Sequence, residues 1–492
     1  MSATSGAEAS SVWLRRTLWV LGLALAARLV SLWFNNTDLF FDEAQYWVWG
    51  KEPAFGYFSK PPVLGWTIGA FTAVCGDSTF CIRLPSPFFH TLTALLIFAT
   101  AQRLFDARTA FWAALLYALL PAVSLSSTVI STDVPLLLFW ALALYAFIRF
   151  EAEQGWEWAV VLGLAIGGGL MAKYAMFYFL LCAAIYSLGS EKRPHILTSA
   201  KFWVAVVIAL ACLLPNILWN QQNSFATVSH TGENIGWGGQ FPNLAGLGEF
   251  FASQFGVMGP LMFIVYLAGL VRLPVEGMNQ KQWLLIAFST PVLLIICFQA
   301  VMAKAYANWA AAAYIAATIM VADFMVNYIP EWWRRVTVSL HLGVFVVLAI
   351  AVCFAKPGQL PLPGDLNPFE RMQGAEASGR EAARLIEPGD AVILTDNRRM
   401  SALMAYYLRD TGLTFAAWRE GEAVTDHFEL TRAYQDDPRT PVFYMTRSSN
   451  PAGVIAQFDD AELLGTFKPR AGEIRQVWFY RLRDYAGAVQ NQ

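Results

Sequence analysis

An adjacent acidic pair and a later lysine stand just after the first long apolar run of this 492-residue chain. Asp42 and Glu43 lie among aromatic residues in the stretch FDEAQYWVWGKEPAFGYFSKPP, and Lys60 precedes its two closing prolines. Such aromatic density is typical of a chain that leaves lipid and lies along the membrane interface. A carboxylate there has the chemistry to take a proton from a hydroxyl group, and a lysine can offset the charge of a phosphate. The plainer interpretation is a helix cap, because acidic residues stabilise the first turn of a helix.

Further ionisable residues border later apolar runs. Asp133 begins one such run in STDVPLLLFW, Lys173 follows three glycines in GGGLMAKY, and Lys304 comes shortly before Asn308. Charged groups near bilayer depth are costly and usually face a cavity or a partner. Ordinary explanations stay open for two of them. Asp133 can serve as a residue that starts a helix, and the side chain of Lys173 can reach the interface along its own apolar stem.

The composition describes a polytopic membrane protein. Of the 492 residues, 57% are hydrophobic and only 14% are charged, which excludes an ordinary soluble protein. The net charge of -2 and the lack of basic runs longer than a pair give no support for nucleic-acid binding. Half of the acidic and basic residues follow Ala355, so we expect the membrane part to end there and a water-soluble part to follow.

The chain is predicted to have about eleven transmembrane helices, because a span needs roughly 20 apolar residues. The run from Val63 to Val74 is too short to cross and is expected to form an interfacial helix within a first outer loop over 35–81. The apolar stretch 156–189 exceeds one span, so we expect a break at Gly167–Gly169 and a turn near Lys173. The predicted spans cover 12–34, 82–104, 109–128, 133–150, 156–172, 173–189, 202–219, 249–271, 282–300, 306–326 and 336–355.

Lysines and arginines predict the orientation of these spans. With the N-terminus in the cytoplasm, twelve of them flank the spans on the cytoplasmic side and five on the outer side. An odd number of spans then delivers the C-terminal part to the outside. The same orientation places six candidate residues together on that outer side: Asp42, Glu43, Lys60, Asp133, Lys173 and Lys304.

The C-terminal part, 356–492, is predicted to be a small α/β domain. A linker rich in proline and glycine, KPGQLPLPGDLNP, leads into it. AVILTD, PVFYMT and QVWFYRLR have the composition of strands, and RRMSALMAYYLR has that of a helix. The domain has no glycine-rich phosphate loop and no evident catalytic cluster, which favours a structural cap or a module that docks the acceptor.

The order of motifs resembles that of a known family. FDEAQYW, GYFSKPP, RLPS, STDVPLLLFW, GLMAKY and ANWAAAAY follow one another over an apolar multi-span chain. In this order they are similar to the GT-C membrane glycosyltransferases related to protein O-mannosyltransferases and to the transferases that add aminoarabinose to lipid A. The resemblance covers most of 10–355 and implies a catalytic membrane domain over 1–355. It implies transfer of a sugar from a polyprenyl-phosphate carrier to an envelope acceptor at the periplasmic face of a bacterial inner membrane.

The resemblance also implies roles for individual residues. Asp42 matches the catalytic aspartate of the first outer loop and is expected to be the general base. Glu43 and Asp133 are expected to orient that base or to hold a divalent cation, and metal dependence stays open. Direct displacement would invert the anomeric carbon, so no covalent sugar-enzyme intermediate is needed. The residues expected at the donor phosphate are Lys60, Lys173, Arg83 and Lys304, with Asp42 and Lys60 meeting the donor in one shared hollow.

Two other classes of protein compete with this interpretation. A transporter or flippase of polyprenyl-linked lipids would use the same charges along a substrate pathway, and Arg28 and Asp323 lie within predicted spans as such a pathway requires. A scaffold whose outer domain recruits partners would not need the acidic pair and a lysine together. The sugar and the acceptor stay open, since lipid A or lipopolysaccharide, another envelope glycan and protein hydroxyls all fit. Cys75 and Cys81 can form a disulfide if their loop is extracytoplasmic.

Overall fold

The computed structural model forms two compact units. It describes residues 3–190, 196–236, 241–356, 359, 367–387, 392–435 and 441–486, so most of the predicted linker lies outside the described residues. A helical unit comprises Met1–Trp33, Lys60–Leu64 and Arg83–Ile350. A loop-and-sheet unit comprises Phe34–Ser59, Gly65–Ile82 and Ala351–Gln492. Most of the predicted first outer loop therefore belongs to the same unit as the C-terminal domain.

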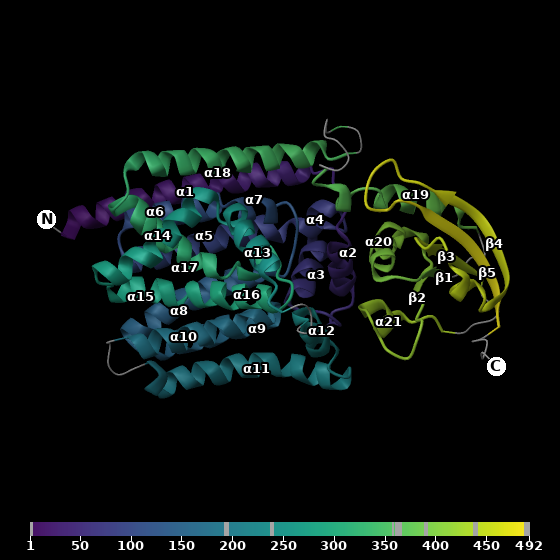
Figure 1. Cartoon of the computed structure of the whole chain (residues 1–492), viewed down its shortest axis with the longest axis horizontal. Coiled ribbons are helices and arrows are strands. Elements are labelled where there is room, and N and C mark those ends of the chain that lie inside the picture. The colour runs from purple at the N-terminus through teal and green to yellow at the C-terminus, as the bar shows by residue number, and fades with distance from the viewer. Residues whose placement is uncertain are drawn as a thin grey trace. The chain divides into compact units, whose positions relative to one another are not determined.

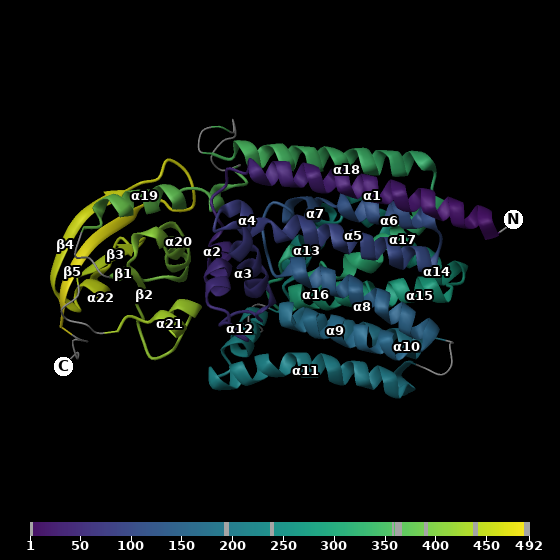
Figure 2. The same ribbon diagram turned by 180° about the vertical axis from the view of Figure 1, so that it is seen from behind.

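The helical unit is built from apolar helices that pack side by side (Figure 1). The first and last of them, α1 and α18, run beside each other (Figure 2), and Ser31 Oγ donates a hydrogen bond to the Ala349 carbonyl over 2.8 Å. Its helices are α1 (Ala3–Trp33), α5 (Pro85–Leu104), α6 (Ala107–Ala118), α7 (Pro121–Ser126), α8 (Asp133–Glu153), α9 (Trp156–Ala172), α10 (Phe177–Gly189), α11 (Ala200–Gln222), α12 (Ala226–Ile235), α13 (Leu244–Val257), α14 (Pro260–Glu276), α15 (Gln280–Ala287), α16 (Thr290–Met302), α17 (Ala313–Asn327) and α18 (Glu331–Ala351).

The prediction of a polytopic membrane protein is confirmed, and the helices are more broken than the apolar runs suggest. By length and composition, six described helical segments can cross a membrane, or seven if α13 and α14 form one span. Those two helices bend by 114°, where Gly259 has a φ of +87° and Pro260 opens the next helix. The run 109–128 is split in the same way, because α7 begins at Pro121. Proline and glycine thus shorten helices that hydropathy alone counts as full spans.

The glycines of α9 do not break that helix. α9 continues through Gly167–Gly169 to Ala172, and the break comes at Lys173, whose φ of -161° and ψ of 133° are extended. A Cβ atom added to Gly167 would lie 2.6 Å from Cys212 Cβ on α11. The glycines therefore allow neighbouring helices to approach closely. The predicted turn near Lys173 is confirmed, whereas the predicted break at the glycines is wrong.

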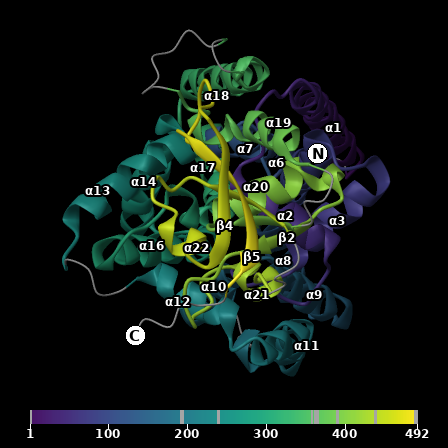
Figure 3. The same ribbon diagram turned by 90° about the vertical axis from the view of Figure 1, so that its right-hand side faces the viewer.

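The loop-and-sheet unit contains a five-stranded mixed sheet with the strand order β2-β1-β3-β5-β4. Figure 3 shows β4 and β5 side by side. β1 pairs in parallel with β2 and β3, while β5 pairs antiparallel with β3 and β4. The prediction of a small α/β domain is confirmed, since AVILTD, PVFYMT and QVWFYRLR form β1, β3 and β5. β2 and β4 were not predicted, because β2 is short and β4 is mostly exposed and polar. The strands are β1 (Val392–Thr395), β2 (Thr414–Ala417), β3 (Val442–Thr446), β4 (Phe458–Phe467) and β5 (Val477–Tyr485).

The first-loop helices are integrated with the helices of the sheet domain. Trp47 packs edge-on against Tyr406 at a centroid distance of 5.2 Å, and Tyr406 donates a hydrogen bond from its hydroxyl to the Asp77 carbonyl over 2.8 Å. A disulfide joins Cys75 to Cys81. The helices of this unit are α2 (Phe41–Lys51), α3 (Val63–Cys75), α4 (Thr79–Arg83), α19 (Ala375–Leu385), α20 (Arg398–Tyr407), α21 (His427–Arg432) and α22 (Ala452–Ile455). The predicted short helix at 63–74 is α3.

Candidate active site

The acidic pair lies in the first turn of helix α2, and its two acids have different partners. The backbone N–H of Phe40 donates a hydrogen bond to Glu43 Oε2 over 2.9 Å, and Glu43 is buried. This bond satisfies a free N–H at the start of the helix, as glutamate commonly does at this position. The plainer interpretation of helix capping therefore holds for Glu43. Asp42, one residue earlier, points its carboxylate to another group.

Asp42 is paired with Arg398, the first residue of α20. Arg398 Nη2 donates a hydrogen bond to Asp42 Oδ1, and Arg398 Nε donates one to Gln45 Oε1 over 2.7 Å. Asp42 and Gln45 lie three residues apart on α2, so they share one face of the helix. About a third of each charged side chain is exposed, 31% for Asp42 and 33% for Arg398. The carboxylate is thus held in place and remains open to solvent.

The guanidinium groups of Arg398 and Arg399 both lie close to the ring of Phe41. The guanidinium carbon of Arg398 lies 5.1 Å from the centre of that ring, and the guanidinium carbon of Arg399 lies 4.9 Å from it. Arginine stacked on an aromatic ring gains about 0.5–1 kcal/mol at an exposed site. Arg399 donates to Glu473 and not to Asp42. The two neighbouring arginines share one ring and have different carboxylate partners.

Asp133, Lys173 and Asn308 meet in the helical unit from three separate segments. Asp133 Oδ1 accepts a hydrogen bond from Lys173 Nζ over 2.6 Å, and Asp133 Oδ2 accepts one from Asn308 Nδ2 over 2.6 Å. The side chains of Asp133 and Lys173 are only 12% and 18% exposed. Both oxygens of the carboxylate are therefore satisfied. The structure brings two predicted site residues together here, and the extended backbone at Lys173 allows this ammonium to reach the acid.

The remaining predicted residues are spread over the helical unit. Lys60 is half-buried, Arg83 ends α4 and is fully buried, and Lys304 Nζ lies 4.7 Å from the centre of the Tyr306 ring. Their expected contacts with a donor phosphate stay predictions. The shared hollow expected for Asp42 and Lys60 also stays a prediction, because the two residues belong to different units.

The acids do not form a metal-binding set in the part of the chain that the structure describes. No group of three His, Cys, Asp or Glu residues is placed to hold a metal ion among those residues. Glu43 accepts from a backbone N–H, Asp42 accepts from a guanidinium group, and both oxygens of Asp133 are engaged. The residues present do not fit a divalent cation, so no step proposed below runs through a metal.

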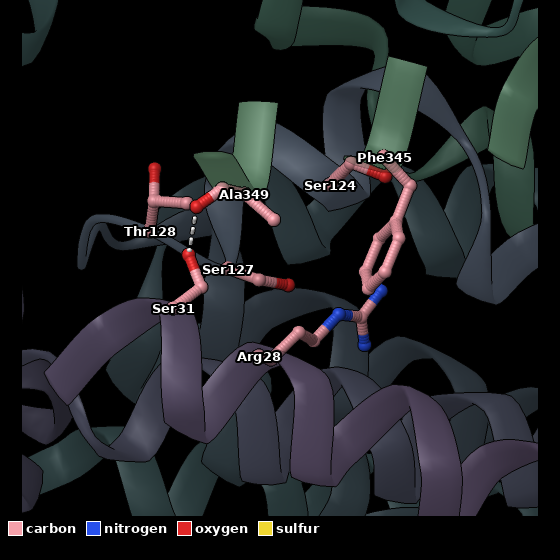
Figure 4. A pocket seen from close by; sticks show the side chains of 7 residues that line it. All are labelled: Arg28, Ser31, Ser124, Ser127, Thr128, Phe345 and Ala349. Atoms are coloured by element: carbon pink, nitrogen blue, oxygen red, sulfur yellow. Dashed lines mark hydrogen bonds between the residues drawn. The ribbon is translucent and has the colours of Figure 1, made fainter. Parts of the chain in front are cut away.

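A small pocket in the helical unit surrounds Arg28 and contains none of the predicted site residues. Arg28 Nη2 donates a hydrogen bond to the Ala118 carbonyl, and its guanidinium carbon lies 5.7 Å from the centre of the Phe345 ring. Asp323, the other charge within a predicted span, accepts a hydrogen bond from Asn327 Nδ2 over 2.7 Å. Both charges have local hydrogen-bond partners. The pocket is lined by Arg28, Ser31, Ser124, Ser127, Thr128, Phe345 and Ala349 (Figure 4).

Sequence reasoning missed Arg398 and Gln45, which hold the acid at position 42. Arg398 was predicted only as part of a helix after a buried strand. That placement itself was a signal, because ligands of open α/β sheets bind beyond the carboxyl ends of parallel strands. β1 ends at Thr395 and α20 starts at Arg398, so the arginine stands at such an end. Nothing in a single sequence pairs it with a residue in the first loop.

Comparisons with known proteins identify the family of the chain. A family model described as dolichyl-phosphate-mannose-protein mannosyltransferase matches residues 59–219. The chain is 35% identical over 465 residues to the lipid A galacturonosyltransferase RgtD of Rhizobium johnstonii, which covers 93% of this chain and 95% of the relative. It is 27% identical over 266 residues to the lipopolysaccharide core galacturonosyltransferase RgtA of the same organism, covering 53% of this chain and 52% of that relative.

A solved structure has the same fold. ArnT from Cupriavidus metallidurans, bound to undecaprenyl phosphate, matches with a TM-score of 0.66 and 14% sequence identity. The match covers 95% of this chain and 98% of that chain. The likeness in fold therefore extends over nearly the whole sequence.

Proposed function

The chain belongs to the GT-C membrane glycosyltransferases that take sugars from polyprenyl-phosphate carriers, and from this premise we propose that it transfers galacturonic acid to lipid A. It is an integral membrane protein with several spans. We place the reaction at the periplasmic face of a bacterial inner membrane, in line with the orientation that the lysines and arginines predict. The donor we propose is undecaprenyl-phosphate galacturonate.

One observation carries this proposal. The similarity to a lipid A galacturonosyltransferase, at 35% identity, extends over 93% of this chain and 95% of the relative. The shorter match is to an enzyme named for the same sugar and for a different acceptor, the lipopolysaccharide core. The sugar is therefore supported by both relatives, and the acceptor by the longer match.

Asp42 is our candidate for the general base. Its carboxylate is exposed enough to meet an acceptor hydroxyl, and its second oxygen is not engaged by Arg398. In the proposed step, Asp42 takes the hydroxyl proton while the hydroxyl oxygen forms a bond to the anomeric carbon of the sugar. The bond between that carbon and the phosphate oxygen breaks, and undecaprenyl phosphate leaves. A single displacement of this kind inverts the anomeric carbon.

The departing phosphate needs compensating positive charge. We assign this role to Lys60, with Arg83, Lys173 and Lys304 as further cations. Lys173 is held 2.6 Å from Asp133, so it contributes through its charge at a distance and Asp133 keeps it oriented. No nucleotide is required, because the carrier phosphate is already the leaving group.

The proposal is tested with the purified full-length protein in lipid nanodiscs. The protein is mixed with undecaprenyl-phosphate galacturonate and lipid A, and the lipid A is examined by mass spectrometry. We expect a gain of one hexuronic acid residue, with release of undecaprenyl phosphate. Transfer of a different sugar, or of the uronic acid to an acceptor other than lipid A, would overturn the specific assignment. Movement of the donor across the bilayer without a new glycosidic bond would instead indicate a flippase.

A further inference from the structure

We propose that Arg398 of the C-terminal domain binds the carboxylate of the donor sugar and thereby selects a uronic acid over a neutral hexose. The inference rests on the proposed function, because it concerns the sugar that Asp42 would act on. It assigns a specificity-determining residue to a domain that the sequence suggested only as a cap or as a docking module. All of the residues that carry it belong to the loop-and-sheet unit.

The guanidinium group of Arg398 is only partly used. Its Nη2 donates to Asp42 and its Nε donates to Gln45, whereas its Nη1 donates no hydrogen bond to any residue that the structure describes. An arginine side chain offers five N–H donors in a rigid planar fork. One edge of this fork is therefore free for a ligand, while the opposite side stays fixed to α2.

The position of this free edge suits a carboxylate on the sugar. A guanidinium group that holds Asp42 on one nitrogen can hold a second carboxylate on another, since the two acceptors approach different N–H groups of one plane. In a hexuronic acid the carboxylate is attached to the carbon on the far side of the ring oxygen from the anomeric carbon. A sugar whose anomeric carbon faces the acceptor beside Asp42 therefore carries its carboxylate only a few atoms away. A neutral hexose has a hydroxymethyl group there and gains no ion pair.

The buried side chain of Gln45 holds Arg398 although one of its own amide atoms is left without a hydrogen-bond partner in the part of the chain that the structure describes. Its side chain is completely buried, and its Nε2 atom has no hydrogen-bond partner among the described residues. A buried amide N–H without a partner destabilises the folded state. The oxygen of the same amide accepts from Arg398 Nε, which orients the guanidinium plane. Such an unsatisfied group in a buried position requires an explanation, and the orientation of Arg398 provides one.

The neighbouring arginine offers a matched control. Arg399 stacks on the same Phe41 ring and is 40% exposed, but it is paired with Glu473 and does not contact Asp42. Substitutions of the two arginines remove the same charge from the same ring. Only the substitution of Arg398 removes the guanidinium edge beside the proposed base.

The experiment measures the binding of two donors to full-length protein in nanodiscs. Undecaprenyl-phosphate galacturonate and undecaprenyl-phosphate galactose differ at one carbon, and the ratio of their Kd values does not depend on the fraction of folded protein. We expect the unsubstituted protein to bind the uronate donor about 10- to 100-fold more tightly, as a hydrogen bond between charged groups provides. Arg398→Gln should bring this ratio close to one, Arg398→Lys should restore part of it, and Arg399→Gln should leave it unchanged.

Three results would overturn the inference. The first is equal binding of both donors by the unsubstituted protein. The second is an Arg398→Gln variant that binds both donors more weakly by the same factor, as expected if the arginine only positions Asp42. The third is an Arg399→Gln variant that lowers the ratio of Kd values as much as Arg398→Gln does. Transfer of the uronic acid to lipid A is measured on the same unsubstituted sample. If transfer occurs and the binding ratio is insensitive to Arg398, the inference fails and the proposed function stands. If a different sugar is transferred, both fail.

Discussion

Two carboxylate–cation pairs in this protein have the same chemistry and different surroundings. Asp133 and Lys173 are largely buried, and an asparagine satisfies the second oxygen of the acid. Asp42 and Arg398 are about one-third exposed, and one oxygen of Asp42 and one nitrogen of Arg398 face no partner in the described part of the chain. The first pair is closed to further ligands, whereas the second pair is not.

The difference indicates which pair is structural and which is available for chemistry. Removing one member of a buried ion pair leaves an uncompensated charge and is strongly destabilising, while an exposed pair contributes little to stability. A group that gives a proton to a substrate or takes one from it has to exchange its partner. This exchange is easier when the ion pair contributes little to the free energy of unfolding. We therefore expect substitutions at position 42 to affect mainly activity. Substitutions at positions 133 and 173 should mainly affect folding, and loss of the Lys173 charge should lower activity in addition.

The largest effect is expected from Asp42→Asn. An amide has the shape of the carboxylate but cannot accept the hydroxyl proton, so transfer of the sugar should fall by about 10²- to 10⁴-fold. The midpoint of thermal unfolding should stay close to that of the unsubstituted protein, because the pair is exposed. Sugar transfer and thermal unfolding are measured on the same preparation in detergent. Asp410→Asn, at an acid that is 87% exposed and paired with Arg409, is the control and should change neither. Full activity of Asp42→Asn would exclude Asp42 as the base.

The buried pair should respond in the opposite way. Lys173→Met leaves the Asp133 carboxylate buried with only Asn308 as a partner, and the free energy of unfolding should fall by about 3–5 kcal/mol. The double variant Asp133→Asn with Lys173→Met removes both charges and should be less destabilised than Lys173→Met alone. Thermal unfolding of the unsubstituted protein, of each single variant (Lys173→Met and Asp133→Asn) and of the double variant gives the coupling energy. Strictly additive effects would contradict the assignment of this pair as a closed, mutually dependent unit.

Sequence reasoning found the two pairs to different extents, for physical reasons. The acids at the starts of apolar runs were visible because charge is rare near a membrane. The pairing of Asp133 with Lys173 was within reach, since both were predicted at the outer ends of neighbouring spans. Arg398 was not, because its contact with Asp42 joins segments 356 residues apart and depends on a fold in which the first loop packs onto the sheet domain. Composition and periodicity carry no information about such a contact.

The limits for the fold have a similar origin. Apolar runs identified where helices occur, and alternating or buried runs identified three of the five strands. Hydropathy does not register backbone geometry, so Gly259 and Pro260 were counted inside a span although they bend it. β4 was missed because its side chains are mostly exposed, and its stability comes from hydrogen bonds with β5 that no local pattern reveals.

A smaller effect, on the pH dependence of stability, is expected from His427. This residue extends the comparison to a buried group near the exposed pair. Its ring lies 5.5 Å from the Trp49 ring and 5.7 Å from the Tyr57 ring, so the first residue of α21 packs against the first loop. Burial, assisted by the charges of Arg432 and Arg398, lowers the pKa of His427 to about 3. Below a pH of about 6.5 the imidazole of His427 binds a proton in the unfolded chain but stays neutral in the folded chain.

Stability should therefore fall as the pH drops from about 6.5 towards 3, by about 2 kcal/mol at pH 5. The sign follows because the unfolded state binds more protons throughout this range. His427→Phe keeps an aromatic ring and has no proton to bind, so this part of the pH dependence should disappear. Thermal unfolding of both proteins between pH 5 and 8 tests this. A slope that is identical in the two proteins would show that His427 does not contribute.

The smallest effect is expected from Lys51, whose ammonium lies 2.6 Å from Asp77 in an exposed ion pair. Burial raises the pKa of Asp77, but hydrogen bonds from Lys51 and Trp47 outweigh it and hold that pKa below its usual value. A carboxyl group whose pKa is lower in the folded state stabilises the fold at any pH above its unfolded pKa of about 3.9. This stabilisation is lost as the pH falls through the folded pKa. Lys51→Met should lower the free energy of unfolding by less than about 1 kcal/mol at neutral pH, because the pair is solvent-exposed. Below the folded pKa of Asp77 the substitution should not change this free energy. Thermal unfolding of both proteins at pH 7 and at successively lower pH measures this loss and its disappearance. A loss as large as that of Lys173→Met would mean that exposure does not separate the two kinds of pair.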